Sequence, residues 1–292
     1  MSYTFIHNGT LIDGLGGPPL PNASVLIQDE RIVAVGRRAE VRLPDADVNL
    51  LDAHGGTILP GLIDTHVHLM IEGMDMQKIM TTPFSFAFFE AIDRMRRTVD
   101  AGVTTVRDAG GVDLGVKQAV EQGLVVGPRI QISVVGLSIT GGHGDGWMPS
   151  GLFFDFRPPY PGMPDGICDG VQDVRRKVRE VLRAGAQVVK VCTTGGVLSP
   201  TDHPEFTQFT VEELRAIVQE AAFRRGIKVM AHAQGSEGDD QPRDPHHHLE
   251  GGVEPVCHEA SPVFWQPGDE CSHEDAEEDD REDPALRHGL ER

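Results

Sequence analysis

The stretch that decides the fold is residues 57–68, TILPGLIDTHVH. A short apolar run leads here directly into two histidines that are separated by one residue. Runs of this length, rich in branched side chains and bounded by turn residues, predict a β-strand. Because residues i and i+2 of a strand point to the same face, both imidazoles are expected to project together from its carboxyl end.

The chain that follows alternates between helical and strand patterns. Helices are predicted over residues 84–101, a short segment that ends near 123, 169–184 and 210–226. Strands are predicted over residues 103–107, 129–135, 187–191 and 227–232. The last helix begins with a capping box, Thr210 and Glu213, and helices that close on glycine before apolar strands are typical of a parallel sheet. The pattern predicts an α/β fold, a partial (β/α)8 TIM barrel of about five to six βα units.

Three regions are expected along the chain. Residues 1–56 carry short strand patterns, including a hairpin of 24–28 with 31–35, and predict a small β-domain. Residues 57–258 contain the barrel units. Residues 259–292 are acidic with few apolar side chains, and such a composition predicts a disordered tail because it cannot offset the entropy of ordering.

Charge and composition argue against several classes of protein. Of the net charge of −19, residues 236–292 contribute −14 through 18 acidic and 4 basic residues, which argues against nucleic-acid binding. No apolar run is long enough for a transmembrane helix, and the N-terminus lacks a secretory pattern. The four cysteines lie far apart, as is typical of free thiols in a reducing compartment. A cytoplasmic protein without membrane partners is expected.

His66 and His68 are the first candidate metal ligands. Neutral imidazole is a common ligand of zinc and related ions, and the two rings share one face of a strand end. Two unrelated surface histidines are the alternative, since the His-x-His pattern is common by itself. The apolar run before the pair and its place at a strand end favour the metal site.

Lys190 and His232 stand at matching places in later strands. A lysine in an apolar strand is costly unless its charge is paired or neutralised. Strand position alone favours a buried salt bridge, and conversion by CO₂ to a carbamate that can bridge two cations is the alternative. His232 by itself would be a satisfied core histidine, but it ends a strand on the same barrel face as the others. The four side chains are expected to converge in one pocket at the strand ends.

His143 lies in a Gly- and Pro-rich stretch, residues 137–168, that follows the third barrel strand. Long loops of this kind carry active-site residues, and an irregular insertion would have the same composition. Two interpretations of His143 stay open: a catalytic role, in binding substrate or polarising the scissile carbonyl, and no role.

Four motifs occur in a characteristic order. They are GLIDTHVH at 61–68, GVTTVRD at 102–108, VKV at 189–191 followed by GGVLSP at 195–200, and AHA at 231–233. In this combination the chain resembles the amidohydrolase superfamily, in particular its imidazolonepropionase-like and Xaa-Pro dipeptidase-like members, from residue 1 to about 235. The resemblance implies a TIM barrel preceded by strands of a β-sandwich domain.

The resemblance also implies a centre of two divalent metal ions, expected to be zinc. By position, the ligands would be His66, His68, Lys190 as a carbamate, and His232. His258 has the spacing of the family's sixth-strand histidine, although the helix that should precede it is absent. The family's eighth-strand aspartate, which binds metal and transfers a proton, has no counterpart here. The resemblance therefore points to a C-terminal truncation or a reading-frame error, and predicts little or no hydrolase activity for the chain as written.

The function implied is hydrolysis of amide-type carbon–nitrogen bonds by a metal-activated water. The implied substrates are small-molecule amides, namely dipeptides that end in proline or cyclic amides. Two alternatives stay open: an inactive remnant of such an enzyme, and a non-enzymatic scaffold on the same fold. An open barrel would expose sheet edges, which favours association into a homo-oligomer.

Overall fold

The structure, a computed structural model, describes residues 1–73, 75–154, 160–197, 201–224 and 226–234. The sequence predicts that His258 is a metal ligand and that residues 259–292 form a disordered tail. Both lie outside the described residues. Within the described ranges, no helix is both long and apolar enough to cross a membrane.

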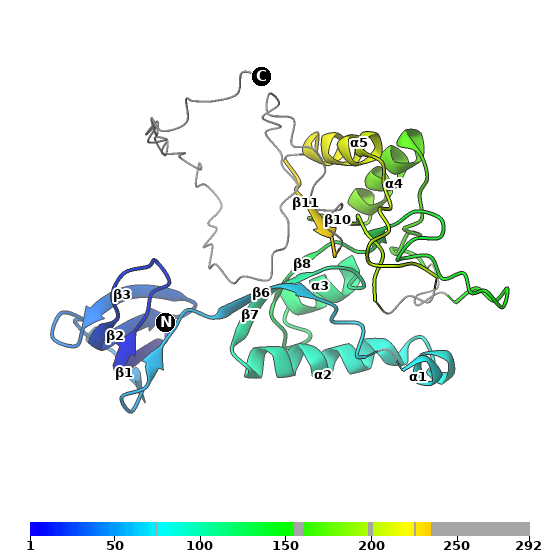
Figure 1. Cartoon of the computed structure of the whole chain (residues 1–292). Helices are drawn as coiled ribbons and strands as arrows, with labels where there is room; N and C mark the ends of the chain where they lie inside the picture. The colour runs from blue at the N-terminus through cyan, green and yellow to red at the C-terminus, as the bar shows by residue number, and fades with distance from the viewer. Residues whose placement is uncertain (74, 155–159, 198–200, 225, 235–292) are drawn as a thin grey trace, which may run out of the picture. The chain divides into compact units, whose positions relative to one another are not determined.

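The N-terminal residues form one five-stranded sheet (Figure 1). Its strands are β1 (Tyr3–Leu11), β2 (Leu20–Gln28), β3 (Arg31–Arg37), β4 (Val48–Asp52) and β5 (Thr57–Ile58). Their order is β3-β2-β1-β4, and β5 also pairs with β1. β2 and β3 are antiparallel across a turn at Asp29, which has a left-handed φ of 51°, so the predicted hairpin is confirmed. Phe5, Leu26 and Val41 form the small core of this sheet.

From residue 62 on, helices and strands alternate, and the named strands pair in parallel. The strands are β6 (Leu62–Val67), β7 (Val103–Asp108), β8 (Arg129–Ile132), β9 (Gly136–Leu137), β10 (Val189–Cys192) and β11 (Val229–His232). The helices are α1 (Met76–Thr81), α2 (Phe86–Asp100), α3 (Leu114–Glu121), α4 (Val171–Arg183) and α5 (Val211–Ala222). Parallel strands place their carboxyl ends at one edge, where ligands bind in folds of this kind. The predicted α/β class is confirmed.

The third predicted strand of this region is interrupted and forms two short strands, β8 and β9. Because β8 pairs with β7 and β9 pairs with β10, residues 129–137 connect the two three-stranded sheets. The split falls at Val134, whose φ of 68° is unfavourable for a β-branched residue. Gly111 N donates to Val134 O at 2.7 Å, which holds the chain in this turn. The strand predicted over 129–135 is therefore wrong at its carboxyl end.

Local signals at the helix ends agree with the sequence in most places. Gly102 after α2 and Gly185 after α4 have φ of 87° and 100°, a conformation that glycine adopts without strain. The predicted capping box is present, because Thr210 and Glu213 each bind the other's backbone N–H. α5 ends at Ala222, however, and not at Gly226 as expected.

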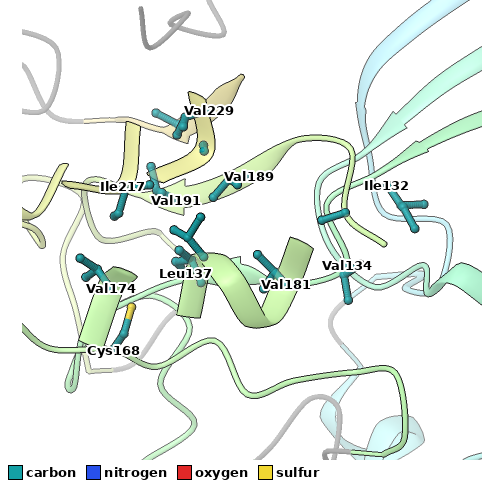
Figure 2. Packing of buried hydrophobic residues seen from close by; sticks show 14 of the residues in the cluster. Ile132, Val134, Leu137, Cys168, Val174, Val181, Val189, Val191, Ile217 and Val229 are labelled. Atoms are coloured by element: carbon teal, nitrogen blue, oxygen red, sulfur yellow. The ribbon is translucent and has the colours of Figure 1, made fainter. Parts of the chain in front are cut away.

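A buried aliphatic cluster lies between α4, α5 and the strands beside them (Figure 2). Val174 and Val181 of α4 and Ile217 of α5 belong to the same cluster as Val189 and Val191 of β10. Burial of these side chains holds β10 against the helices and so fixes the strand that carries Lys190.

Ile217→Ala is expected to lower the free energy of unfolding by about 2–5 kcal/mol, because it removes buried methyl groups and leaves a cavity. Urea unfolding of the full chain, followed by circular dichroism, measures the loss. Val211→Ala on the same helix is the control, since Val211 is 38% exposed whereas Ile217 is fully buried. The control should change stability by no more than about 0.5 kcal/mol, and equal losses in both variants would contradict the packing described.

Candidate active site

His66 and His68 stand at the carboxyl end of β6. Their rings meet edge to face with centroids 5.5 Å apart, consistent with two residues on one face of a strand. His68 Nδ1 lies 2.9 Å from Gly110 O. Since a carbonyl oxygen only accepts, Nδ1 carries the proton in this contact and Nε2 keeps a lone pair that can bind a cation.

Asp108, the last residue of β7, holds this strand end in place. Its buried carboxylate accepts hydrogen bonds from Leu69 N at 2.8 Å, Gly110 N at 3.0 Å and Val112 N at 3.1 Å. The first bond anchors the chain directly after His68, and the other two shape the turn whose carbonyl binds the His68 ring. Reasoning from the sequence assigned Asp108 no role; its position at the end of a predicted strand was the available signal.

Asp108→Asn is expected to lower the free energy of unfolding by about 1.5–3 kcal/mol, the contribution of a hydrogen bond to a charged group. An amide has only one acceptor oxygen, so the backbone hydrogen bonds to the other oxygen of Asp108 are lost. Urea unfolding provides the measurement. Asp100→Asn is the control, because Asp100 forms an exposed ion pair with Arg96, and such pairs contribute about 0–1 kcal/mol. An Asp108 variant as stable as the wild type would show that these backbone hydrogen bonds do not stabilise the fold.

Lys190 lies in β10 between Gly136 of β9 and Met230 of β11. It is 4% exposed, and its Nζ has no hydrogen-bond partner among the described residues. Burial lowers the pKa of the amine, an effect that nearby Cys192 opposes and the positive Arg107 increases. A Cβ at position 136 would lie 3.3 Å from Lys190 Cγ, so the glycine leaves room for the lysine stem.

The buried salt bridge that strand position favoured for Lys190 is therefore wrong for the described part of the chain. No carboxylate of these residues bonds to the amine. The physical reason is that the neighbouring strands present apolar or small residues at this level, Met230 on one side and Gly136 on the other. Within the described ranges, the lysine is left as a buried amine without a countercharge.

β11 ends at His232, whose ring stacks on that of His143 with centroids 4.4 Å apart and 18° between the ring planes. The pKa of His232 is lowered to about 4, mainly by burial and also by the nearby His143 and Lys190. Burial also lowers the pKa of His66 to about 4, although part of that side chain stays exposed, with Lys190 as the next cause. Both imidazoles are therefore neutral at pH 7, the form that binds metal ions.

The pKa shifts link three of these strand-end residues. The Lys190 charge contributes to the lowered pKa of both His66 and His232, and His232 contributes to that of His66. His143, from the loop after β9, joins them through its stacked ring. Among the described residues, no three His, Cys, Asp or Glu side chains are grouped to hold a metal ion, and Lys190 is not of these types.

The family model for the amidohydrolase family matches residues 57–254. The chain belongs to the amidohydrolase family. This amidohydrolase is 37% identical over 247 residues to ochratoxinase of Aspergillus niger, a match that covers 80% of this chain and 51% of that protein. It is 34% identical over 113 residues to enamidase of Eubacterium barkeri, which covers 38% of this chain and 26% of the enamidase. The chain thus spans about half the length of the ochratoxinases that it matches.

Solved structures resemble this chain over about four fifths of its length. A prolidase in complex with N-methylphosphonate-L-proline has a TM-score of 0.69 and 40% identity, over 80% of this chain and 56% of the prolidase. A Xaa-Pro dipeptidase with methionine bound in its active site has a TM-score of 0.70 and 32% identity, over 81% of this chain and 58% of the dipeptidase. The predicted family is confirmed, and the described α/β region of this amidohydrolase is TIM-barrel-like.

Proposed function

We propose that this amidohydrolase hydrolyses amide-type carbon–nitrogen bonds at a metal centre whose ligands include His66, His68, Lys190 and His232. One observation carries the proposal: the Lys190 amine is buried without a hydrogen-bond partner among described residues, and it acts electrostatically on two neutral histidines. A buried cation among imidazoles and near Arg107 is unfavourable. Addition of CO₂ to the neutral amine, with release of one proton to solvent, would give a carbamate anion whose charge bound cations would balance.

The donor set fits a zinc-type ion. Imidazole nitrogens with anionic oxygens are common ligands of zinc, and a carbamate offers two oxygens that two ions can share. Divalent ions, when bound, would supply a hydroxide nucleophile near neutral pH and polarise the substrate carbonyl. His258, outside the described residues, belongs to the same proposal as a ligand of the second ion.

The protein itself orients the histidine ligands and keeps them in the protonation state that binds metal. The Gly110 carbonyl keeps the proton of His68 on Nδ1, and Asp108 fixes the turn that presents this carbonyl. Burial keeps the rings of His66 and His232 unprotonated, so no proton must leave them before they bind an ion. Removal of hydrogen bonds that orient metal ligands typically lowers metal affinity by about 10–100-fold.

Small amides and dipeptides are the proposed substrates. Support comes from the similarity to ochratoxinase, to a prolidase that binds a phosphonate derivative of proline, and to a Xaa-Pro dipeptidase. We assign the catalytic role to residues 57–258 as part of a TIM barrel. We also propose that the N-terminal sheet, which includes β5 at Thr57–Ile58, belongs to a β-sandwich domain.

The test uses the full chain, expressed with zinc and bicarbonate. Metal content is measured by mass spectrometry, and hydrolysis is measured on a panel of Xaa-Pro dipeptides and N-acyl amino acids. We expect bound zinc and a turnover that a chelator removes and zinc restores. Metal binding without turnover would favour the inactive alternative, and a chain that binds no metal would overturn the proposal.

A further inference from the structure

We propose that Asp202 is a positioning residue for His143: it holds the proton of the imidazole on Nδ1, so that Nε2 is the ring atom left to accept a proton or a hydrogen bond at the neighbouring centre. Sequence reasoning assigned Asp202 no role. The role at the centre rests on the proposed function, whereas the tautomer of His143 is a property of the chain itself.

The contact joins two loops that are distant in sequence. His143 Nδ1 lies 3.4 Å from Asp202 Oδ2, and the Asp202 side chain is only 2% exposed. The same oxygen accepts hydrogen bonds from Gly196 N at 3.0 Å and from Gln208 Nε2 at 3.4 Å. The carboxylate is therefore held by its own loop and turned toward the histidine.

Two buried polar atoms in this pair lack hydrogen bonds. His143 Nδ1 and Asp202 Oδ1 are inaccessible to solvent and have no hydrogen-bond partner among the described residues. Buried polar groups left unsatisfied are costly, and nearly all are paired in folded proteins. At 3.4 Å, the Nδ1–Oδ2 separation is no longer than the Gln208 contact, but the ring N–H is not aligned with the oxygen, so a small rotation would satisfy the imidazole. The carboxylate only accepts, and the proton in that bond must therefore come from Nδ1.

The His143 ring is confined from two further sides. It stacks on His232 with centroids 4.4 Å apart. A Cβ at Gly196 would lie 2.1 Å from its Cε1, so only glycine allows the backbone to approach the ring this closely. Packing against His232 and Gly196 thus limits how the ring can turn, and the carboxylate decides which nitrogen carries the proton.

A second set of hydrogen bonds ties the two loops together. Ser138 Oγ donates to Gln208 Oε1 at 3.0 Å and accepts from Gly144 N at 2.9 Å. Gln208 in turn donates to Asp202. Gly144, next to His143, is thereby linked through Ser138 to Gln208, which binds Asp202. A buried network of this kind fixes the relative position of its members.

This geometry bears on what His143 could do at the centre. Polarising a substrate carbonyl with a neutral ring requires a proton on Nε2. With the proton held on Nδ1 by Asp202, the neutral ring offers Nε2 as an acceptor, suited to take a proton from a nucleophilic water or a hydrogen bond from a substrate N–H.

The test is the tautomer of His143 in the full-length chain labelled with ¹⁵N. Long-range ¹H–¹⁵N spectra separate an imidazole protonated on Nδ1 from one protonated on Nε2, and a His143→Gln variant assigns the signal. We expect the proton on Nδ1 in the wild type. Asp202→Ala should lose this signature, and the zinc-loaded variant should lose kcat by about 10²-fold or more at an unchanged KM and metal content.

The matched control is Asp145→Ala. Asp145 lies in the same loop as His143, and its carboxylate accepts from Gly141 N at 2.7 Å and Trp147 N at 3.1 Å. The Asp145→Ala substitution should loosen the loop and leave the His143 tautomer unchanged. A wild-type ring protonated on Nε2, or an Asp202→Ala ring still protonated on Nδ1, would overturn the proposal, and the wild-type spectrum decides even if the variant does not fold. Failure of the proposed function is distinct, because it would appear as absent metal beside an intact tautomer.

Discussion

Lys190→Met is expected to abolish metal binding and hydrolysis while leaving the metal-free protein at least as stable as the metal-free wild type. Methionine keeps the length of the side chain and removes a buried amine that has no hydrogen-bond partner in the described part of the chain. Because leaving such a group unsatisfied costs about 1–3 kcal/mol, the free energy of unfolding should stay the same or rise by up to that amount. Because zinc lowers the pKa of a bound water from 15.7 to about 7, loss of the ion should reduce turnover by at least about 10³-fold.

Lys177→Met is the matched control for this change. Lys177 is also buried, but its Nζ donates to Asp165 O at 2.8 Å and pairs with the Asp165 carboxylate at 3.3 Å. Its replacement should lower stability and leave the metal content unchanged, so the two lysines are expected to respond in opposite directions. Metal content by mass spectrometry and urea unfolding measure both effects. A Lys190→Met protein that retains zinc would contradict the assignment of Lys190 as a ligand.

His66→Ala is expected to lower zinc content and to reduce hydrolysis by at least about 10²–10³-fold, because it removes a ligand to the ion that makes the nucleophile. The neutral state of His66, whose pKa burial lowers to about 4, means that the loss should be present at pH 7 and above. Zinc titration of the apo-protein, followed by calorimetry, measures the affinity.

His54→Ala serves as the control for His66. His54 is an exposed residue of the N-terminal region, with its side chain 84% accessible and near Asp52. Its removal should change neither zinc affinity nor turnover. Equal zinc affinities of the His66 variant and the wild type would remove His66 from the centre.

The sequence was most informative where local periodicity and chemistry coincide. The two-residue period of a strand predicted that His66 and His68 share a face, and their rings lie 5.5 Å apart. Lys190 stood out as a charged residue in an apolar strand, and its burial follows from the same pattern. Thr210 and Glu213 predicted a helix start that the capping box confirms.

The sequence was least informative where a contact joins distant segments. Asp108 binds Leu69 N and Val112 N, and Asp202 faces His143 from another loop, so no spacing rule indicated either carboxylate. The absence of a carboxylate bonded to Lys190 within the described residues was equally invisible, because it depends on which strands become neighbours. The positive φ of Val134 is a tertiary effect that overrides the strand preference of valine.

Anomalous diffraction at the zinc edge, from crystals of the full chain grown with zinc and bicarbonate, tests the central claim most directly. We expect a zinc peak within about 2.0–2.2 Å of imidazole nitrogens of His66 and His68, and of a carbamate oxygen on Lys190 Nζ. A bare Lys190 amine, with zinc bound elsewhere on the chain or absent, would contradict the account.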